Sequence, residues 1–347
     1  MMGRLTFVGL GLGARGISLE GVVAIREADT CYLEYYTTPH EPTLLKELEN
    51  ETGRVMTVVD REFVEDGREI LKEARDSRVV LAVPGDPMIA TTHNDLRVRA
   101  IGQKTETAVV HAATITSSAA SASGLHYYKF GRTITITRET LDMMQQAYHT
   151  IQSNLLQGLH TLLLLEFDVQ DGEGAAPQAV FEGLLSAEKN FRREVLSEET
   201  FALVLSRIGR KDPELRAGYL KDLRKTNYGE QPHCVVIPGG LHFTEIEAVA
   251  AIFGIGESEV RDNSRNIKGT AEVLIPRYAA KTRKALNSVR GKLGPEYDAV
   301  LENVELYMKD AEGFLSRGEL ELAMLSMGYA EGLLDSAGFT GKAKIDW

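Results

Sequence analysis

The chain alternates short apolar runs with stretches in which apolar residues recur every three or four positions. The apolar runs predict strands at residues 5–10, 30–33, 55–59, 79–83, 107–111, 133–137, 161–168, 201–206 and 232–240. The helical spacing predicts helices at residues 44–50, 63–76, 96–101, 143–156, 177–187 and 244–252, and another around Ser197. Strands and helices in alternation indicate an α/β fold, which we expect to form two lobes.

The pattern changes beyond residue 260. Residues 261–270 have the Asp, Asn, Ser and Gly content of a linker. Three helices are expected after it, at residues 272–290, between Gly294-Pro295 and Gly318, and at residues 319–337. Pro276 should lie in the first turn of the first of these helices, or just before it.

The second of these helices has one apolar face at helical spacing, which we expect to be packed in a core. Its members are Leu301, Val304, Met308, Ala311 and Leu315. We therefore predict three domains: an N-terminal α/β lobe over residues 1–111, a C-terminal α/β lobe over residues 112–262, and a small all-α accessory domain over residues 271–347.

One turn in the first lobe differs from an ordinary connection. The apolar run at residues 79–83 has the composition of a buried parallel strand and stops at Pro84-Gly85-Asp86-Pro87. Two prolines around a Gly-Asp pair fix the backbone of a tight turn, and a helix opens near Thr92-His93. Open α/β sheets bind ligands at the carboxyl ends of such strands. The alternative is a strand-to-helix connection without chemistry.

The first predicted strand runs into a glycine loop at residues 11–16, followed by Ser18 as a candidate helix N-cap. The loop fits the G-x-G-x-x-G pattern of dinucleotide-binding folds, in which an acidic residue about 20 positions further on binds the ribose. Glu34, at the end of the second strand, is the candidate for that role. Glycine here also permits close backbone approach to a different ligand, or serves strand–helix packing alone.

Residues 112–124 are nearly all small and are predicted to begin a helix. Small side chains and the free N–H groups of a helix N-terminus favour a flat ligand, and they favour a tightly packed domain interface equally. His93, His111 and His126 have no carboxylate at a useful sequence spacing. We therefore expect hydrogen-bonded structural roles for these histidines rather than base catalysis.

The composition excludes several classes of protein. Of 347 residues, 43% are hydrophobic and 26% charged, as in ordinary globular proteins. The net charge of -11 argues against broad nucleic-acid binding, because attraction to phosphates needs surplus Lys and Arg. A local basic stretch around Arg216, Lys221, Arg224 and Lys225 either steers a negatively charged partner or is a solvated surface.

Cysteine usage and hydropathy bear on the compartment. Cys31 and Cys234 are far apart and form no metal-ligand spacing, which favours a reduced cytoplasmic setting. No apolar stretch approaches the roughly 20 residues of a membrane span. The N-terminus is predicted to be a strand followed by glycines rather than a signal peptide.

Three stretches, in order along the chain, resemble the diphthine synthase family: GLGLGARGISLEG near the start, GDPMIATTH at the tight turn and PHCVVIPGGLH near residue 240. The similarity runs from about Leu5 to about Asn266. That family belongs to the tetrapyrrole-methylase class of S-adenosylmethionine-dependent methyltransferases. The resemblance thus implies a two-lobed fold with a cofactor cleft between the lobes. The tail lies outside it and resembles a small helical domain of unassigned role, which we interpret as an interaction or packing module.

The resemblance also implies which residues bind S-adenosylmethionine. Carried onto this sequence, the family's cofactor-binding positions are Leu10, Asp86, Ile89, Thr114, Ile115, Leu165, Ile208 and His233. Several of them would act through backbone N–H and C=O groups, and Asp86 is the best side-chain candidate. The family usually has Asp where Glu166 stands in this chain.

The implied reaction is methylation of an amino group on translation elongation factor 2, at a histidine already bearing an aminocarboxypropyl group. The family also implies a homodimer, and we expect neither a membrane nor a direct nucleic-acid partner. The sequence has no evident nucleophile triad, metal cluster or Walker loop. This is expected for an activated methyl donor, where catalysis is proximity and orientation.

Two alternatives remain open at this point. The first is a catalytically inactive adaptor that binds a translation partner through its helical tail. The second is a methylase that acts on a corrin or porphyrin ring. A nicotinamide-dependent dehydrogenase, suggested by the glycine loop alone, is a more distant third.

Overall fold

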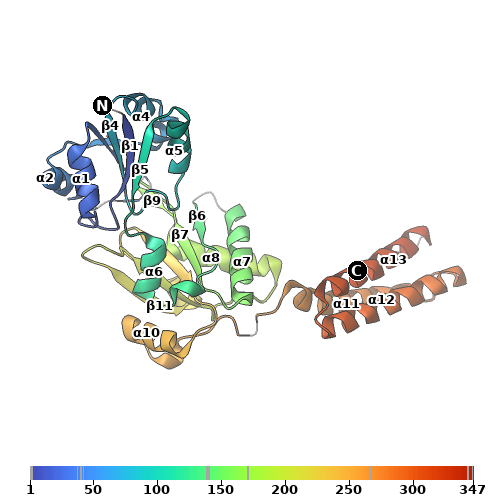
Figure 1. Cartoon of the computed structure of the whole chain (residues 1–347). Helices are drawn as coiled ribbons and strands as arrows, with labels where there is room; N and C mark the ends of the chain where they lie inside the picture. Colours follow the sequence, from blue (N-terminus) through green and yellow to red (C-terminus); the bar gives the residue numbers. More distant parts are fainter. Residues whose placement is uncertain are drawn as a thin grey trace. The chain divides into compact units, whose positions relative to one another are not determined.

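The computed structural model describes residues 3–36, 38–39, 41, 43–137, 141–169, 172–265, 267–341, 344–345 and 347. The chain forms two compact units. Unit 1 comprises residues 1–190 and 196–265, and unit 2 comprises residues 191–195 and 266–347. Unit 1 holds two five-stranded sheets with flanking helices, and unit 2 is helical (Figure 1). The α/β class and the helical tail are therefore confirmed.

The first sheet of unit 1 is entirely parallel. Its strands, in spatial order β3-β2-β4-β1-β5, are β3 (Thr57–Val59), β2 (Thr30–Glu34), β4 (Arg78–Val83), β1 (Arg4–Gly9) and β5 (Glu106–Val110). In the register, Phe7 of β1 lies beside Leu81 of β4 and Val109 of β5. All five strands point the same way, so their carboxyl ends share one edge of the sheet.

Both faces of this sheet are covered, which explains its nearly continuous apolar strands. Side chains alternate between the faces, so Phe7 and Leu81 pack on one side, and Val8 and Ala82 pack on the other. The first side is covered by α3 (Arg61–Asp66), α4 (Arg68–Glu73) and α5 (His93–Gly102). The second is covered by α1 (Leu19–Glu27) and α2 (Leu44–Thr52). Ser18 is the N-cap of α1, as predicted, and accepts a hydrogen bond from the Gly21 N–H at 3.1 Å.

The second sheet of unit 1 is mixed. Its order is β11 (Glu214–Tyr219), β10 (Phe201–Ser206), β12 (His233–Ile237), β7 (Thr161–Leu165) and β6 (Ile134–Ile136). Only the β6–β7 pair is parallel. Helices α6 (Ile115–Ser123) and α10 (Phe243–Phe253) contribute to the core on one face, and α7 (Leu141–Leu156) packs against β6 and β7. The remaining elements are α8 (Pro177–Phe191), α9 (Leu220–Leu223), the ribbon β8 (Phe167–Asp168) and β9 (Glu173–Gly174), and the short helical turns η1 (Tyr127–Lys129) and η2 (Glu257–Glu259).

Unit 2 contains three long helices around its own apolar core. They are α11 (Thr270–Val289), α12 (Asp298–Ser316) and α13 (Leu320–Thr340), with the turn η3 (Pro295–Tyr297) before α12. The predicted apolar face of α12 is in this core, with Leu301, Val304, Met308 and Ala311 buried and Leu315 partly buried. That face is therefore packing surface. The predicted domain boundaries at residues 111/112 and 262/271 stay predictions.

Four predicted elements differ from the structure. The single strand over residues 161–168 is divided into β7 and β8, which belong to different sheets. The single helix over residues 63–76 is broken into α3 and α4 at Gly67, which has φ +61° and ends α3. Residues 192–200, all of them described, hold no helix, because the Ser197 and Glu199 N–H groups bond to side chains in a Ser/Thr turn. Pro276 lies inside α11, in its second turn, where a proline costs one backbone hydrogen bond.

Candidate functional site

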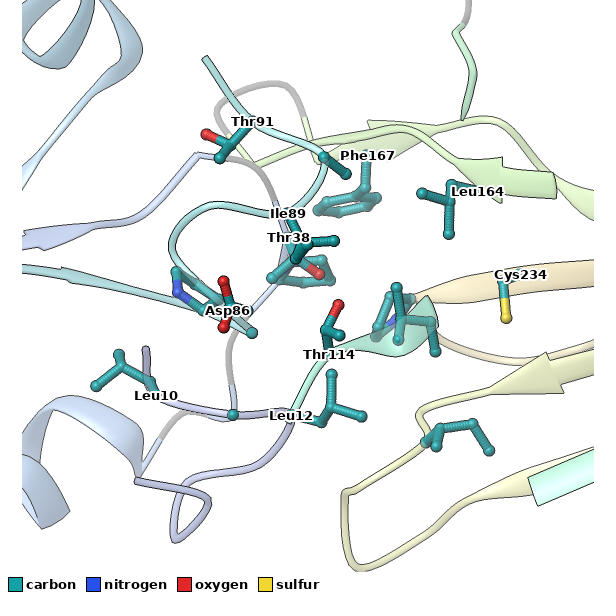
Figure 2. A pocket seen from close by; sticks show the side chains of 18 of the residues that line it. Leu10, Leu12, Thr38, Asp86, Ile89, Thr91, Thr114, Leu164, Phe167 and Cys234 are labelled. Atoms are coloured by element: carbon teal, nitrogen blue, oxygen red, sulfur yellow. The ribbon is translucent and has the colours of Figure 1, made fainter. Parts of the chain in front are cut away.

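A cavity of about 380 Å³ opens at the carboxyl ends of β1, β2, β4 and β5 and reaches residues of the second sheet. Its volume is in the range of small-molecule sites. Figure 2 shows side chains from the glycine loop, the turn after β4 and the second sheet converging on it. All of the predicted cofactor-binding residues line this one cavity, although they lie far apart in the sequence: Leu10, Asp86, Ile89, Thr114, Ile115, Leu165, Ile208 and His233.

Asp86 is the centre of the turn that follows β4. Its side chain is only 7% exposed, and both carboxylate oxygens accept hydrogen bonds. Oδ1 accepts from the Met88 N–H at 3.0 Å, and Oδ2 lies 2.8 Å from His111 Nδ1 and 3.3 Å from the Ala112 N–H. Burial opposes ionisation, but these bonds outweigh it and lower the pKa of Asp86. Asp86 therefore ties the turn to the end of β5.

A second histidine–carboxylate pair lies behind the same turn. His93 Nε2 is 2.9 Å from Glu34 Oε2, and neither side chain is more than 1% exposed. His93 Nδ1 lies 3.0 Å from the Pro87 carbonyl oxygen and 2.9 Å from the Thr91 hydroxyl. Both ring nitrogens therefore lie close to oxygen atoms of the surrounding fold. The pair connects the end of β2 to the turn and holds it, including Ala90 at the strained φ of +56°.

This pair corrects two expectations. Glu34 is fully buried against His93 and is not among the cavity-lining residues, so it cannot serve as a ribose ligand. The histidines do have carboxylate partners, but they come from distant segments, such as Asp86 for His111. That their role is structural rather than catalytic stays a prediction.

Two glycines are required by the cavity wall. Gly85 has φ +69°, and a Cβ there would meet no atom closer than 4.0 Å, so the turn leaves open space beside its backbone. Gly13 has the opposite constraint, because a Cβ would lie 2.3 Å from the Gly209 carbonyl oxygen. The glycine loop is therefore needed for close contact with the turn after β10, as well as for lining the cavity.

His233 and Cys234 belong to the second sheet, line the cavity and are both uncharged. His233 is buried, and Nδ1 lies 2.8 Å from the Ser206 hydroxyl. Burial, followed by the nearby Arg207 charge, lowers the pKa of His233 to about 4, so the ring is neutral at pH 7. Burial raises the pKa of Cys234 to about 12, so the thiol stays protonated and is not a nucleophile.

Several cavity residues were not predicted from the sequence. Among them, Arg61 and Arg210 line the cavity, and each follows a strand after a short interval, at β3 and β10. That position at a strand end is the signal that would have pointed to them. The Arg210 guanidinium donates to the backbone carbonyls of Pro39 and Gln231, which ties the loops of the cavity together.

Another buried carboxylate lies in unit 1 but not at the cavity. Glu245 is fully buried and accepts hydrogen bonds from the His126 and His242 N–H groups at 2.8 Å, from His160 Nε2 at 2.9 Å, and from Lys129 Nζ. Burial opposes its ionisation, yet these donors, Lys129 first among them, lower the pKa of Glu245 to about 2. Neither Glu245 nor its four partners are among the cavity-lining residues.

The basic stretch near residue 220 is largely neutralised. Arg216, Lys221 and Arg224 each pair with a carboxylate, at 2.8, 2.7 and 2.8 Å respectively. This favours the solvated-surface interpretation over steering of a partner. Within the part of the chain that the structure describes, no cluster of three or more His, Cys, Asp or Glu is arranged to hold a metal. In the same residues, no helix has the length and apolar character needed to cross a membrane.

Comparison with known proteins agrees with this geometry. Residues 4–224 match the family model of tetrapyrrole (corrin/porphyrin) methylases, and residues 277–343 match a family described as a protein of unknown function, DUF357. The fold and the cavity thus define unit 1 as a methylase of the tetrapyrrole-methylase class.

Individual relatives narrow this class. The diphthine synthase of Methanosarcina mazei is 36% identical over 75% of this chain and 99% of its own length, and that of Methanosarcina barkeri is 38% identical over 72% and 96%. A crystal structure of diphthine synthase superposes with a TM-score of 0.65 at 30% identity, covering 74% of this chain and all of that one. The chain belongs to the diphthine synthase family. It is therefore a methyltransferase of diphthamide biosynthesis, and the adaptor and ring-methylase alternatives are not favoured.

Proposed function

We propose that the cavity binds S-adenosylmethionine and that this chain methylates the amino group of an aminocarboxypropyl-histidine on translation elongation factor 2. The observation that carries the proposal is the convergence of the eight predicted residues on one cavity. Nothing in their sequence positions alone requires them to meet. A cofactor could contact all eight of the family's positions only if these residues lie around one cavity, as they do.

The chemistry of the cavity fits such a donor. Ile89 is 43% exposed in the cavity wall, and Leu10, Leu165 and Ile208 add apolar surface for a flat base and a methionine chain. Thr114 and Ile115 begin α6, whose first N–H groups have no partner within the helix and can donate to polar ligand atoms. The open space beside Gly85 admits a ligand close to the backbone.

The donor supplies an activated methyl group, and its transfer to an amine nitrogen requires that nitrogen to lose a proton. The contribution of the chain is to orient the two partners and to exclude water. Asp86 and the His93–Glu34 pair fix the turn that lines the donor side of the cavity. A neutral His233 adds no positive charge to a cavity that would hold a cationic sulfonium.

Elongation factor 2 is proposed as the protein partner, and a homodimer and a cytoplasmic location are proposed with it. Family membership supports these three statements. Light scattering on the purified chain tests the dimer, since a monomeric mass at micromolar concentration contradicts it.

Calorimetry with S-adenosylhomocysteine, with NAD as the control ligand, tests the cofactor. We expect binding of S-adenosylhomocysteine alone. Methyl transfer to elongation factor 2 bearing the aminocarboxypropyl-histidine then tests the acceptor, with the unmodified factor as control. A folded protein that binds no S-adenosylhomocysteine would contradict the proposal.

A further inference from the structure

The charged side chains that line the cavity differ in how many hydrogen bonds they form within the protein. Asp86 accepts three hydrogen bonds within the fold. Glu41 accepts one from the Ala14 N–H at 2.8 Å, and Arg210 donates to two backbone carbonyls. These three groups form hydrogen bonds that hold the cavity wall together. The guanidinium of Arg61 also lines the cavity, but it forms no such hydrogen bond among the described residues.

Arg61 is the first residue of α3, and its side chain is 53% exposed. Its guanidinium lies 5.5 Å from the centre of the Tyr36 ring, and its Nη2 is 4.0 Å from Glu166 Oε1. A separation of 4.0 Å is the outer limit of an ion pair and is too long for a hydrogen bond. Among the described residues, Arg61 donates no side-chain hydrogen bond, although a guanidinium carries five N–H donors.

Both neighbours of Arg61, Tyr36 and Glu166, also line the cavity. Glu166 directly follows Leu165, one of the proposed donor contacts, and both line the cavity. The Tyr36 ring supports the guanidinium through a cation–π contact, which restricts its motion while leaving its N–H groups available. Burial raises the pKa of Tyr36, so the phenol is neutral and does not compete as an anion for Arg61.

We propose that Arg61 is the specificity-determining residue that binds the carboxylate of the acceptor's aminocarboxypropyl group, so that the cavity selects an α-amino-acid end group over a simple amine. The inference rests on the proposed function. A planar guanidinium forms two parallel hydrogen bonds to a carboxylate, which fixes the position of the neighbouring carbon and its amino group. The Glu166 carboxylate, 4.0 Å from Arg61 Nη2, can accept a hydrogen bond from the neighbouring amino group.

The test uses the full chain loaded with S-adenosylhomocysteine and two synthetic probes. One is an imidazole bearing an aminocarboxypropyl chain, and the other bears an aminopropyl chain that lacks the carboxylate. We expect the wild type to bind the first at least about tenfold more tightly, from a charge-assisted pair. Arg61→Met should abolish this preference by weakening the first probe alone, and Arg61→Lys should restore part of it, since Lys keeps the charge but not the two-point geometry.

Arg68→Met is the matched control, because Arg68 begins the next helix, is exposed and is not among the cavity-lining residues. Its probe preference and its affinity for S-adenosylhomocysteine should both equal those of the wild type. Equal weakening of both probes by Arg61→Met, or no change in either, overturns the assignment of Arg61. A wild type that binds S-adenosylhomocysteine but neither probe, and does not methylate elongation factor 2, overturns the proposed acceptor and this inference together.

Discussion

The turn after β4 and the start of α10 are two regions of unit 1 built on the same chemistry. Each has a buried carboxylate that accepts hydrogen bonds from a histidine and from backbone N–H groups, Asp86 in one and Glu245 in the other. In both, hydrogen bonds outweigh burial and lower the pKa of the carboxyl. Only Asp86 lines the cavity.

The difference shows that a buried histidine–carboxylate cluster does not by itself identify a functional site. Glu245 joins η1, the start of β7 and the start of α10, and neither it nor its partners are among the residues that line the cavity, so we expect it to contribute to stability. Asp86 and the His93–Glu34 pair hold a turn that lines the cavity, so in the proposed function they fix the shape of the ligand site. The location of the open space, rather than the pKa shift, separates the two roles.

Removing the Glu245 carboxylate should have the largest effect. Glu245→Ala leaves Lys129 and His160 without their acceptor, and breaking a buried charge pair costs about 3–5 kcal/mol of unfolding free energy. Urea denaturation measures this loss, and calorimetry on the folded variant should give wild-type affinity for S-adenosylhomocysteine. A selective loss of that affinity would show that the two clusters are not functionally distinct.

The stability that Glu245 contributes should depend on pH in a defined direction. Its pKa is about 2 in the folded protein, below the ordinary value of 4.5, so the contribution is complete above about pH 4.5 and is lost as the pH falls towards 2. The shift corresponds to about 3 kcal/mol. Unfolding free energies measured across this range should fall more steeply for the wild type than for Glu245→Gln, and parallel curves would contradict the assignment.

Replacing Asp86 should act chiefly on the ligand. Asp86→Ala removes the acceptor of three hydrogen bonds, and bonds to a charged group contribute about 1.5–3 kcal/mol. We expect the Kd for S-adenosylhomocysteine to rise by about ten- to a hundredfold, with a smaller rise for Asp86→Asn, which keeps an oxygen for the Met88 N–H. A wild-type Kd in Asp86→Ala would remove the turn from the site.

The His93–Glu34 pair should give a smaller change in affinity, because it acts through the turn from behind. His93→Gln lacks the two opposed ring nitrogens that lie 2.9 Å from Glu34 Oε2 and 3.0 Å from the Pro87 carbonyl oxygen. We expect about a tenfold weaker binding of S-adenosylhomocysteine, with probe preference at Arg61 unchanged. If His93→Gln lowers only the melting temperature, the pair belongs with Glu245 and serves stability alone.

Local pattern was enough to predict most of the elements. The run Val79–Val83 was predicted as a buried parallel strand because both of its faces are apolar, and the structure places it at the middle of a covered sheet. The break at Gly67 was missed because helical periodicity continues across it, and only its φ of +61° reveals the break. The prediction at Ser197 failed because side-chain hydrogen bonds satisfied the backbone instead of a helix.

The linear pattern of residues specifies the α/β class, the helical tail and the tight turn, and the family resemblance indicates the eight cofactor-binding positions. These depend on backbone propensity and on short-range spacing, which a linear sequence records directly. The partners of the buried charged groups follow only from the tertiary structure, as in the Glu34–His93 and Asp86–His111 pairs. The same is true of Arg61, which the fold brings to the cavity beside Tyr36 and Glu166. Those pairings join residues whose separation along the chain carries no signal, because they follow from how strands and helices stack in three dimensions.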